Sequence, residues 1–344
     1  MKCSLHACVI VSAALFACAP ATPGPESGPD VSAAAGPEVT EFGLTVGDLE
    51  SARQLFVDVL GAEVVRTADA GGPELAALTG LPEARATAVH LRLGRERVLL
   101  VQFGERGKSW RSDARSTDLE FQHLAIVVRD IDEAHERGMA AGLRPVSSGG
   151  PQRIPDSNAA AAGIRAFYFR GLGGHPLELI WFPSDKRQPR WHESSGPLVL
   201  GIDHSAITVS STEDSLAFYR DGIGLSIVGQ SANQGVEQEP LSGVDGAHVR
   251  ITGLRGRRGP GVELLEYLWP RGGRPRTSDS TPRDSFHWEM GVRVADLERA
   301  VAKLIAAGAE SVSTRIARCE LCVVGRRAFV LRDPDGHAVR LVEE

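Results

Sequence analysis

Short stretches in which apolar and polar residues alternate recur at four places along the chain. They begin at Glu41, His123, His204 and Glu289, so their starts are separated by 82, 81 and 85 residues. Alternation of this kind predicts a half-buried β-strand. Each stretch is followed by a segment whose apolar residues keep helical spacing, as between residues 49 and 60 in the first copy. A repeat of this length predicts four copies of one supersecondary unit.

The limits of the predicted helices are marked by residues that favour helix ends. Asp48, Asp130 and Asp296 stand where an N-cap is expected in the first, second and fourth copies. Each helix is expected to end at a glycine, and these glycines are Gly61, Gly142, Gly224 and Gly308. Further strand-like segments follow each helix, so every copy is expected to be a βαβββ module.

The four modules fall into two kinds. Modules one and three share the related segments 88–94 and 247–253, whereas modules two and four share a different ending, at 167–179 and 329–341. This alternation indicates duplication of a two-module unit.

Several short motifs carry a family resemblance. They are Asp-Leu-Glu-x-Ala at Asp296, Phe-Tyr-x-Asp-x-x-Gly-Leu at Phe218 and Asp-Pro-Asp-Gly-His at Asp333. Together with a His before a Val/Ile-rich strand, they resemble the vicinal oxygen chelate superfamily of glyoxalases, bleomycin-resistance proteins and extradiol dioxygenases. The resemblance implies an α+β fold of four βαβββ modules that form two glyoxalase-like domains with cupped mixed sheets. We expect the first domain at 38–183, a linker at 184–199 and the second domain at 200–344.

In that superfamily, the cup holds a divalent metal through residues of the first and last strands of each module. The first-strand positions here are Glu41, His123, His204 and Glu289, and the last-strand positions are Leu99, Glu178, Glu263 and Arg340. Modules two and three therefore keep both ligands. The resemblance thus implies a metal site, for Zn, Ni, Mn or Fe, at His123, Glu178, His204 and Glu263.

Two pairings of the modules remain open. If neighbouring modules share a cup, Glu41 joins His123 and Glu178, while His204 and Glu263 join Glu289 and Arg340. If the pairing is swapped, one cup holds His123, Glu178, His204 and Glu263, a set whose charge offsets a divalent ion. The other cup then holds Leu99 with a secondary site of Glu41, Glu289 and Arg340, in which the guanidinium balances the carboxylates without a metal. We favour the swapped arrangement slightly.

The carboxylates also make a physical case without the resemblance. Glu178 and Glu263 lie in strongly apolar strands, where a buried carboxylate is costly unless it is paired or binds a metal. Because side chains alternate along a strand, Glu263 and Glu266 point to opposite faces, and we expect Glu263 to face the cup. The alternatives are glutamates that reach water at a strand edge and histidines that are hydrogen-bonded in the core.

The resemblance implies an enzyme of lyase or isomerase type, in which Glu178 and Glu263 transfer protons on a small oxygenated substrate. The alternative is a metal-free protein that binds or sequesters a small molecule. Four further residues are weak candidates for substrate contacts: His90, Arg92, His248 and Arg250. Extradiol dioxygenases place iron on modules three and four, at positions held here by His204, Glu289 and Arg340. Because arginine cannot bind iron, that activity is disfavoured.

Composition and the N-terminus complete the picture. The formal net charge of −6 gives no reason to expect a nucleic-acid partner. Residues 1–18 resemble a signal peptide with a lipobox, in which Cys18 carries the lipid, and 19–37 is an Ala/Pro/Gly-rich tether. We expect an exported lipoprotein anchored in the bacterial cell envelope, or, if cleavage follows Ala19, a soluble periplasmic or secreted protein. Cys319 and Cys322 form a disulfide or remain free thiols. Because the modules are fused, we expect a monomer.

Overall fold

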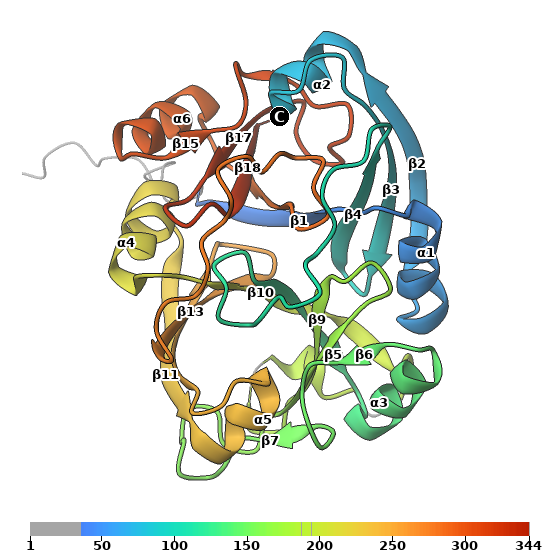
Figure 1. Ribbon diagram of the computed structural model, residues 1–344, viewed down its shortest axis with the longest axis vertical. Coiled ribbons are helices and arrows are strands. Elements are labelled where there is room, and N and C mark those ends of the chain that lie inside the picture. Colours follow the sequence, from blue (N-terminus) through green and yellow to red (C-terminus); the bar gives the residue numbers. More distant parts are fainter. Residues whose placement is uncertain (1–35, 187, 194, 344) are drawn as a thin grey trace, which may run out of the picture. The chain divides into compact units, whose positions relative to one another are not determined.

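The structure of the protein, a computed structural model, describes residues 36–186, 188–193 and 195–343. The predicted signal peptide, the lipidation site Cys18 and the tether up to residue 35 lie outside the described residues. In the described part, no helix has the length and apolar character that a membrane span requires. The expected α+β fold is confirmed, because this part forms four modules of strands and helices (Figure 1).

The odd-numbered modules have an additional helix before their last two strands. Module one contains β1 (Glu38–Thr45), α1 (Leu49–Gln54), η2 (Leu55–Val59), β2 (Glu63–Gly71), α2 (Gly72–Thr79), β3 (Arg85–Leu93) and β4 (Glu96–Phe103). Module three contains β10 (Val199–Thr208), α4 (Thr212–Leu216), η4 (Ala217–Ile223), β11 (Ser226–Gln234), η5 (Gly235–Glu237), α5 (Glu239–Ser242), β12 (His248–Arg255) and β13 (Gly261–Trp269). The helices α2 and α5 were not expected from the sequence pattern.

The even-numbered modules replace the long second strand by two short pieces. Module two contains β5 (Gln122–Val128), α3 (Ile131–Ala140), β6 (Arg144–Pro145), β7 (Gln152–Arg153), β8 (Arg165–Arg170) and β9 (Pro176–Trp181). Module four contains β14 (Trp288–Arg293), α6 (Leu297–Ala306), β15 (Glu310–Ser311), β16 (Ala317–Arg318), β17 (Arg327–Arg332) and β18 (Ala338–Glu343). The short helix η3 (Pro189–Trp191) lies in the linker between modules two and three.

The helix-end predictions match the structure. Asp48, Asp130 and Asp296 each accept a hydrogen bond from a backbone N–H of the first helical turn. Ser211 performs the same task in module three, where no cap had been assigned. In modules one and three the helix continues as a π-helical segment, η2 or η4, which the apolar spacing did not reveal.

The modules pair in the swapped arrangement. The first sheet has the order β15-β17-β18-β14-β1-β4-β3-β2 and so joins modules four and one. The second sheet has the order β11-β12-β13-β10-β5-β9-β8-β6 and joins modules three and two. In each sheet the first strands of two modules meet side by side and antiparallel, as β1 with β14 and β10 with β5. Each half of the sequence, 38–183 and 200–344, therefore contributes strands to both sheets.

Alternation along the central strands separates the core from the cups. Phe42 and Leu44 of β1 pack in an apolar cluster that draws side chains from both sheets and from the helices, including Ile126 and Leu264. The intervening residues of each central strand point to the other, concave face. These concave faces are called the first cup, on the first sheet, and the second cup, on the second sheet.

Two histidines connect module two with module one and module four with module three, although the members of each pair lie in different sheets. His175, in the turn before β9, lies with Nε2 2.8 Å from the carbonyl oxygen of Thr45 in module one. His337, in the equivalent turn before β18, lies with Nε2 2.9 Å from the carbonyl oxygen of Thr208 in module three. Burial lowers the pKa of His175 to about 4, so the neutral ring donates this hydrogen bond.

Candidate metal centre

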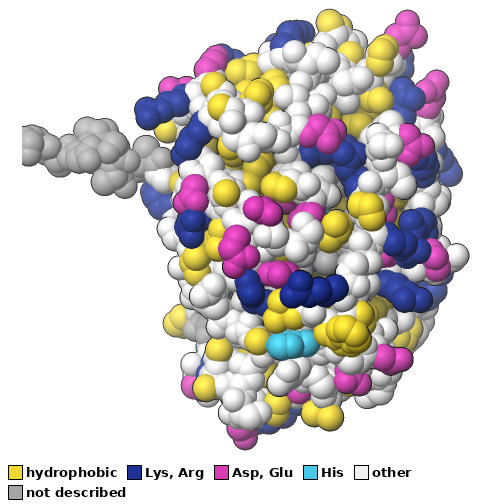
Figure 2. Space-filling view, turned by 60° about the vertical axis from the view of Figure 1, so that its left-hand side comes forward, with side chains coloured by type: hydrophobic (Ala, Val, Ile, Leu, Met, Phe, Trp, Pro, Cys, Tyr) yellow, Lys and Arg dark blue, Asp and Glu magenta, His cyan; other side chains and the backbone are white. Residues whose placement is uncertain are grey.

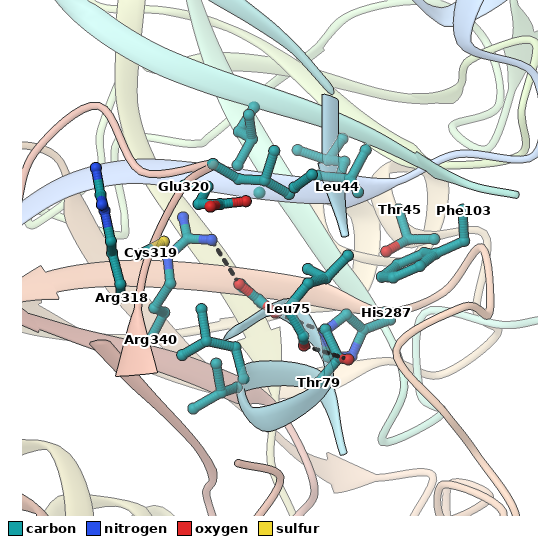
Figure 3. A pocket seen from close by; sticks show the side chains of 18 residues that line it. Leu44, Thr45, Leu75, Thr79, Phe103, His287, Arg318, Cys319, Glu320 and Arg340 are labelled. Carbon is teal, nitrogen blue, oxygen red and sulfur yellow. Dashed lines mark hydrogen bonds and ion pairs between the residues drawn. The ribbon is translucent and has the colours of Figure 1, made fainter. Parts of the chain in front are cut away.

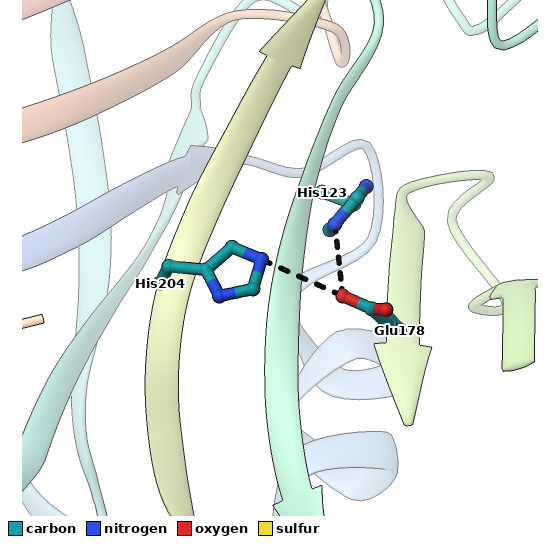
Figure 4. A group of neighbouring side chains, drawn as sticks. All are labelled: His123, Glu178 and His204. Atoms are coloured by element: carbon teal, nitrogen blue, oxygen red, sulfur yellow. Dashed lines mark hydrogen bonds and ion pairs between the residues drawn. The ribbon is translucent and has the colours of Figure 1, made fainter. Parts of the chain in front are cut away.

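The four central strands of the second sheet each present one predicted ligand to the second cup. His123 lies on β5 and His204 on β10, and the two flanking strands carry Glu178 on β9 and Glu263 on β13. Oε2 of Glu178 lies 3.1 Å from Nε2 of His123 and 3.6 Å from Nε2 of His204 (Figure 4). Oε2 of Glu263 lies 3.4 Å from Nε2 of His204. The swapped pairing thus brings all four predicted ligands together.

The sheet registers explain why these positions converge. In every module, the residue two places after the first-strand position lies directly opposite the last-strand position. The four pairs are Gly43 with Leu99, Ala125 with Glu178, Ala206 with Glu263, and Gly291 with Arg340. Each of these first-strand partners is glycine or alanine, which leaves room on the concave face for the longer side chains beside it. A small residue two places after each first-strand position is therefore a sequence signal for this convergence.

The donor set fits a divalent metal ion. His123, Glu178 and His204 are buried, and one ligand atom from each lies within 4.8 Å of the other two. Imidazole nitrogens combined with carboxylate oxygens suit Zn, Ni, Mn and Fe. Two carboxylates would offset the charge of a divalent cation, which reduces the cost of burying them. These four side chains would therefore hold the ion.

Asp203 orients one of the two histidines and was not foreseen. Its Oδ2 lies 3.1 Å from Nδ1 of His204, which directs Nε2 of that ring into the cup. Its Oδ1 accepts hydrogen bonds from Nε1 of Trp191 and from a guanidinium nitrogen of Arg255. Burial alone would lower the pKa of His204, but Glu263, Asp203 and Glu178 raise it above its usual value. By contrast, Nδ1 of His123 has no hydrogen-bond partner among the described residues.

A cavity of about 380 Å³ opens onto Glu178, His204 and Glu263. Apolar side chains such as Ile180 and Leu265 form much of its wall, and Gln230, Asn233 and Lys186 supply polar groups. A small molecule fits a cavity of this size.

Tyr168 also lines this cavity, and it lies opposite Glu178 on the neighbouring strand β8. Its ring centroid is 4.7 Å from that of His123. Burial raises the pKa of Tyr168 well above its usual value, so the phenol stays protonated and can donate a hydrogen bond. In the sequence, Tyr168 lies within the segment 167–179, and no motif sets it apart as a site residue.

The first cup holds an arginine at the equivalent place. Two nitrogens of the Arg340 guanidinium each lie 2.8 Å from a carboxylate oxygen, one of Glu41 and one of Glu289. Arg340 and His287 line the pocket of this cup (Figure 3). Burial alone would raise the pKa of Glu289, but Arg340 and His287 lower it to about 2. Leu99 holds the fourth position. The cation of this cup is therefore a side chain, and the adjoining cavity is only about 40 Å³.

The weaker substrate candidates do not gather in one site. His90 is buried in the first sheet, and burial lowers its pKa to about 4. Arg92 is exposed and pairs with Glu63. Arg250 lies on the face of β12 away from the second cup, because the alternate residues Ile251 and Gly253 line the cavity, and it pairs with Glu213 and Glu266.

His248 stands at the start of β12 opposite Trp269. Glu263 faces the second cup, whereas Glu266 accepts hydrogen bonds from Thr212 on the other face, as expected. Cys319 and Cys322 form a disulfide bond.

Arg340 gives no reason to disfavour an extradiol dioxygenase. That expectation required His204 to share a cup with Glu289 and Arg340, as pairing of modules three and four would bring about. Those modules contribute to different sheets, so Arg340 lies in the other cup and does not affect the ligands around His204. The second cup instead offers two histidines and one carboxylate, with Glu263 as a fourth donor.

Comparison with known proteins agrees with this architecture. A related protein, a 2-epi-5-epi-valiolone epimerase from Actinomyces sp., is 37% identical over 151 residues, which are 42% of this chain and 80% of the epimerase. The crystal structure of glyoxalase I from Zea mays is similar in fold, with a TM-score of 0.59 at 15% identity over 91% of this chain and 95% of that enzyme. The family model matches residues 38–179 and 201–341. The chain therefore belongs to the Glyoxalase/Bleomycin resistance protein/Dioxygenase superfamily.

Proposed function

We propose that the protein is a divalent-metal-dependent enzyme of isomerase type that acts on a small oxygenated substrate in the second cup. The observation that carries this proposal is the convergence of His123, Glu178, His204 and Glu263, the last three of which line an open cavity. When bound by these residues, a divalent ion would supply electrophilic stabilisation of negative charge on the oxygens of the substrate.

The placement of the two glutamates supports epimerisation. Glu178 and Glu263 lie on the strands that flank the two histidine-bearing strands, so they approach the site from opposite sides. Inversion of a carbon beside a carbonyl group requires that one base removes its proton and that an acid returns a proton on the opposite face. Glu178 and Glu263 are proposed for these two tasks. One glutamate gains the proton removed from the substrate and the other gives a proton back, so the protein has no net change in protonation. The related epimerase supports the same reaction class.

The same set of donor atoms is compatible with one competing activity. Two histidines and one carboxylate are also the ligand set of non-haem iron oxygenases. Glu263 favours the isomerase, because a fourth protein donor occupies a coordination position that an oxygenase keeps open for oxygen or substrate. A divalent ion between Glu178 and Glu263 would balance more negative charge than the imidazolium of His204 alone, which favours a metal-bound site over a metal-free binding protein.

Metal content and proton exchange test the proposal together. We expect purified protein to hold one divalent ion per chain, and to exchange the proton beside the carbonyl of 2-epi-5-epi-valiolone with deuterium from solvent. Glu263→Gln is expected to abolish epimerisation while leaving a slower exchange on one face, and Glu178→Gln to do the same for the other face. Glu266→Gln, on the opposite face of the same strand as Glu263, is the matched control.

Three other results would each contradict one part of the proposal. Protein that neither contains nor takes up a divalent ion would contradict metal dependence. Metal-bound protein that consumes oxygen with a catechol and exchanges no proton would replace the isomerase by a dioxygenase. Equal loss of activity in Glu266→Gln and Glu263→Gln would remove the proposed role of Glu263.

We further propose that the chain is exported, lipidated at Cys18 and monomeric. The support is the apolar N-terminal segment before Leu15-Phe16-Ala17-Cys18 and the fusion of four modules in one chain. Mass spectrometry of protein from the producing cell is expected to find a diacylated Cys18 as the first residue. An intact Met1 would contradict export, and an unlipidated start at Pro20 would favour the soluble form.

A further inference from the structure

The linker between modules two and three fills a groove beside the second sheet. Trp191 of η3 is buried against Val127 and Ile164, and its Nε1 donates a hydrogen bond to Asp203. A Cβ atom on Gly201 would approach the Trp191 ring to 3.2 Å, so the glycine leaves room for this side chain. A short segment of polypeptide, anchored by an aromatic ring, is thus the natural occupant of this groove.

The first sheet has a groove at the equivalent place. Equivalence follows from the repeat: Glu38 stands where Gly201 does, three residues before the first-strand ligand position. Arg293 stands where Val127 does, four residues after that position, and Arg326 precedes β17 as Ile164 precedes β8. This groove encloses about 770 Å³. No segment of the described part of the chain fills it as η3 fills its counterpart.

The lining of the two grooves differs in charge. Five arginines line the groove of the first sheet, and they come from four separate segments: Arg95, Arg97, Arg258, Arg293 and Arg326. Two carboxylates also line the groove: Glu38 pairs with Arg257, Arg258 and Arg293, and Glu96 pairs with Arg190. Within the described residues, no carboxylate lies within ion-pairing distance of Arg95, Arg97 or Arg326. The protein as a whole is negative, with a formal net charge of −6, and acidic and basic side chains are interspersed on the face shown in Figure 2.

Apolar residues accompany the arginines. Val323, Val324 and Pro260 also line the groove, and Val323 remains exposed. A single phosphate cannot contact guanidinium groups spread over four segments and an apolar strip at once. An extended segment with acidic residues around an apolar or aromatic one does both.

We propose that this groove binds an extended acidic peptide segment of a partner protein, which occupies the position that Pro189–Trp191 occupies beside the second sheet. The acidic side chains pair with Arg95, Arg97 and Arg326, and the aromatic residue packs on Val323 and Val324. Charge-assisted hydrogen bonds to guanidinium groups give such a contact its strength, and the apolar strip gives it register.

The test uses the full chain and a fluorescein-labelled peptide, Glu-Asp-Trp-Glu-Asp, followed by fluorescence anisotropy. The triple variant Arg95→Gln/Arg97→Gln/Arg326→Gln is expected to weaken binding at least tenfold. The matched control Arg144→Gln/Arg271→Gln/Arg299→Gln removes the same charge from other exposed places and is expected to change binding less than twofold. Replacing the peptide's tryptophan by glycine is expected to weaken binding several-fold.

Three results would overturn the proposal. The first is equal loss of binding in the two triple variants, which would indicate only a general effect of charge. The second is full displacement of the peptide by equimolar inorganic pyrophosphate, which would indicate a small-anion site. The third is binding to phosphatidylglycerol vesicles, lost in the groove variant, without binding of the peptide, which would indicate a lipid surface. Metal content of the variants is measured in parallel, so that a loss of metal binding is distinguished from a loss of peptide binding.

Discussion

The side chains of Asp203 and His204 contact each other although the two residues are neighbours on one strand. Oδ2 of Asp203 lies 3.1 Å from Nδ1 of His204. In a regular strand, consecutive side chains point to opposite faces. Here the register of β10 against β5 shifts between Ile202 and His204, and this β-bulge brings Asp203 beside the ring. The bulge therefore places an orienting carboxylate behind a candidate metal ligand.

Asp203→Asn is expected to weaken metal binding by roughly 10- to 100-fold, because outer partners fix the tautomer and basicity of a ligating histidine. Titration against a chromophoric chelator measures the affinity. Thr40→Ala is the control, because Thr40 holds the position equivalent to Asp203 in the first cup, where it donates to the carbonyl of Gly291. Unchanged affinity in Asp203→Asn would show that the contact does not tune the site.

The ion triad of the first cup leads to a prediction about stability. Arg340 pairs with Glu41 and Glu289, and all three residues lie within the cup with little exposure. Arg340→Met is expected to destabilise the protein by about 3–5 kcal/mol, because it leaves buried carboxylates without a cation. Urea unfolding measures the change.

A compensated variant serves as its control. Glu41→Gln/Glu289→Gln/Arg340→Met removes all three charges, and it is expected to recover most of the lost stability. If the single and triple variants were equally unstable, the loss would come from packing around residue 340 and not from unpaired charge.

Local features of the fold were accessible from sequence because each depends on few residues. Asp48 and Asp296 cap their helices through short-range hydrogen bonds, which a motif reveals. The candidate ligands His123 and Glu178 came from the family resemblance, and the repeat carried the two ligand positions into each module. The resemblance between modules one and three, and between modules two and four, did not specify which first strands would pair. The reason is that β1, β5, β10 and β14 all show the same alternation of apolar residues.

Other features depend on contacts between distant segments and left no local mark. Asp203 follows an apolar stretch like any strand-edge residue, and only the bulge of β10 turns it toward His204. Arg250 was expected in a cup, but the pairing of β12 with β13 places Ile251 beside Leu265 on the cup face and Arg250 beside Glu266 on the opposite face. Trp191 lies in a linker of ordinary composition, and its burial against Val127 depends on the packing of a sheet built from two modules.

His175 is expected to make stability depend on pH. Burial lowers its pKa to about 4, while the unfolded chain titrates near 6.5. Between these values the unfolded state binds more protons, so stability is fully present above pH 6.5 and falls as the pH drops toward 4, by about 3 kcal/mol. His175→Gln keeps a donor toward Thr45 and is expected to flatten this part of the pH profile.

The contribution of His175 to the pH dependence of stability must be separated from the contributions of other buried histidines. Burial also lowers the pKa of His90, to about 4, and the pKa of His287, so the wild-type profile contains these contributions as well as that of His175. The informative quantity is the difference between the urea-unfolding profiles of wild type and His175→Gln, with His192→Gln in the linker as the control. Parallel profiles for wild type and His175→Gln would exclude the proposed contribution.

The disulfide between Cys319 and Cys322 is expected to stabilise the cover of the first cup. The loop packs with Ala77 and Leu78 of α2, and Cys319 and Leu321 line the small cavity beneath. A bridge that spans three residues closes a short ring, so Cys319→Ser/Cys322→Ser is expected to lower the free energy of unfolding by only about 2 kcal/mol. Because the second cup belongs to the other sheet, metal binding there is expected to remain unchanged. Adding a reductant should reproduce the loss in the wild type and have no effect on the variant; a variant that also loses metal would show that the two cups are coupled.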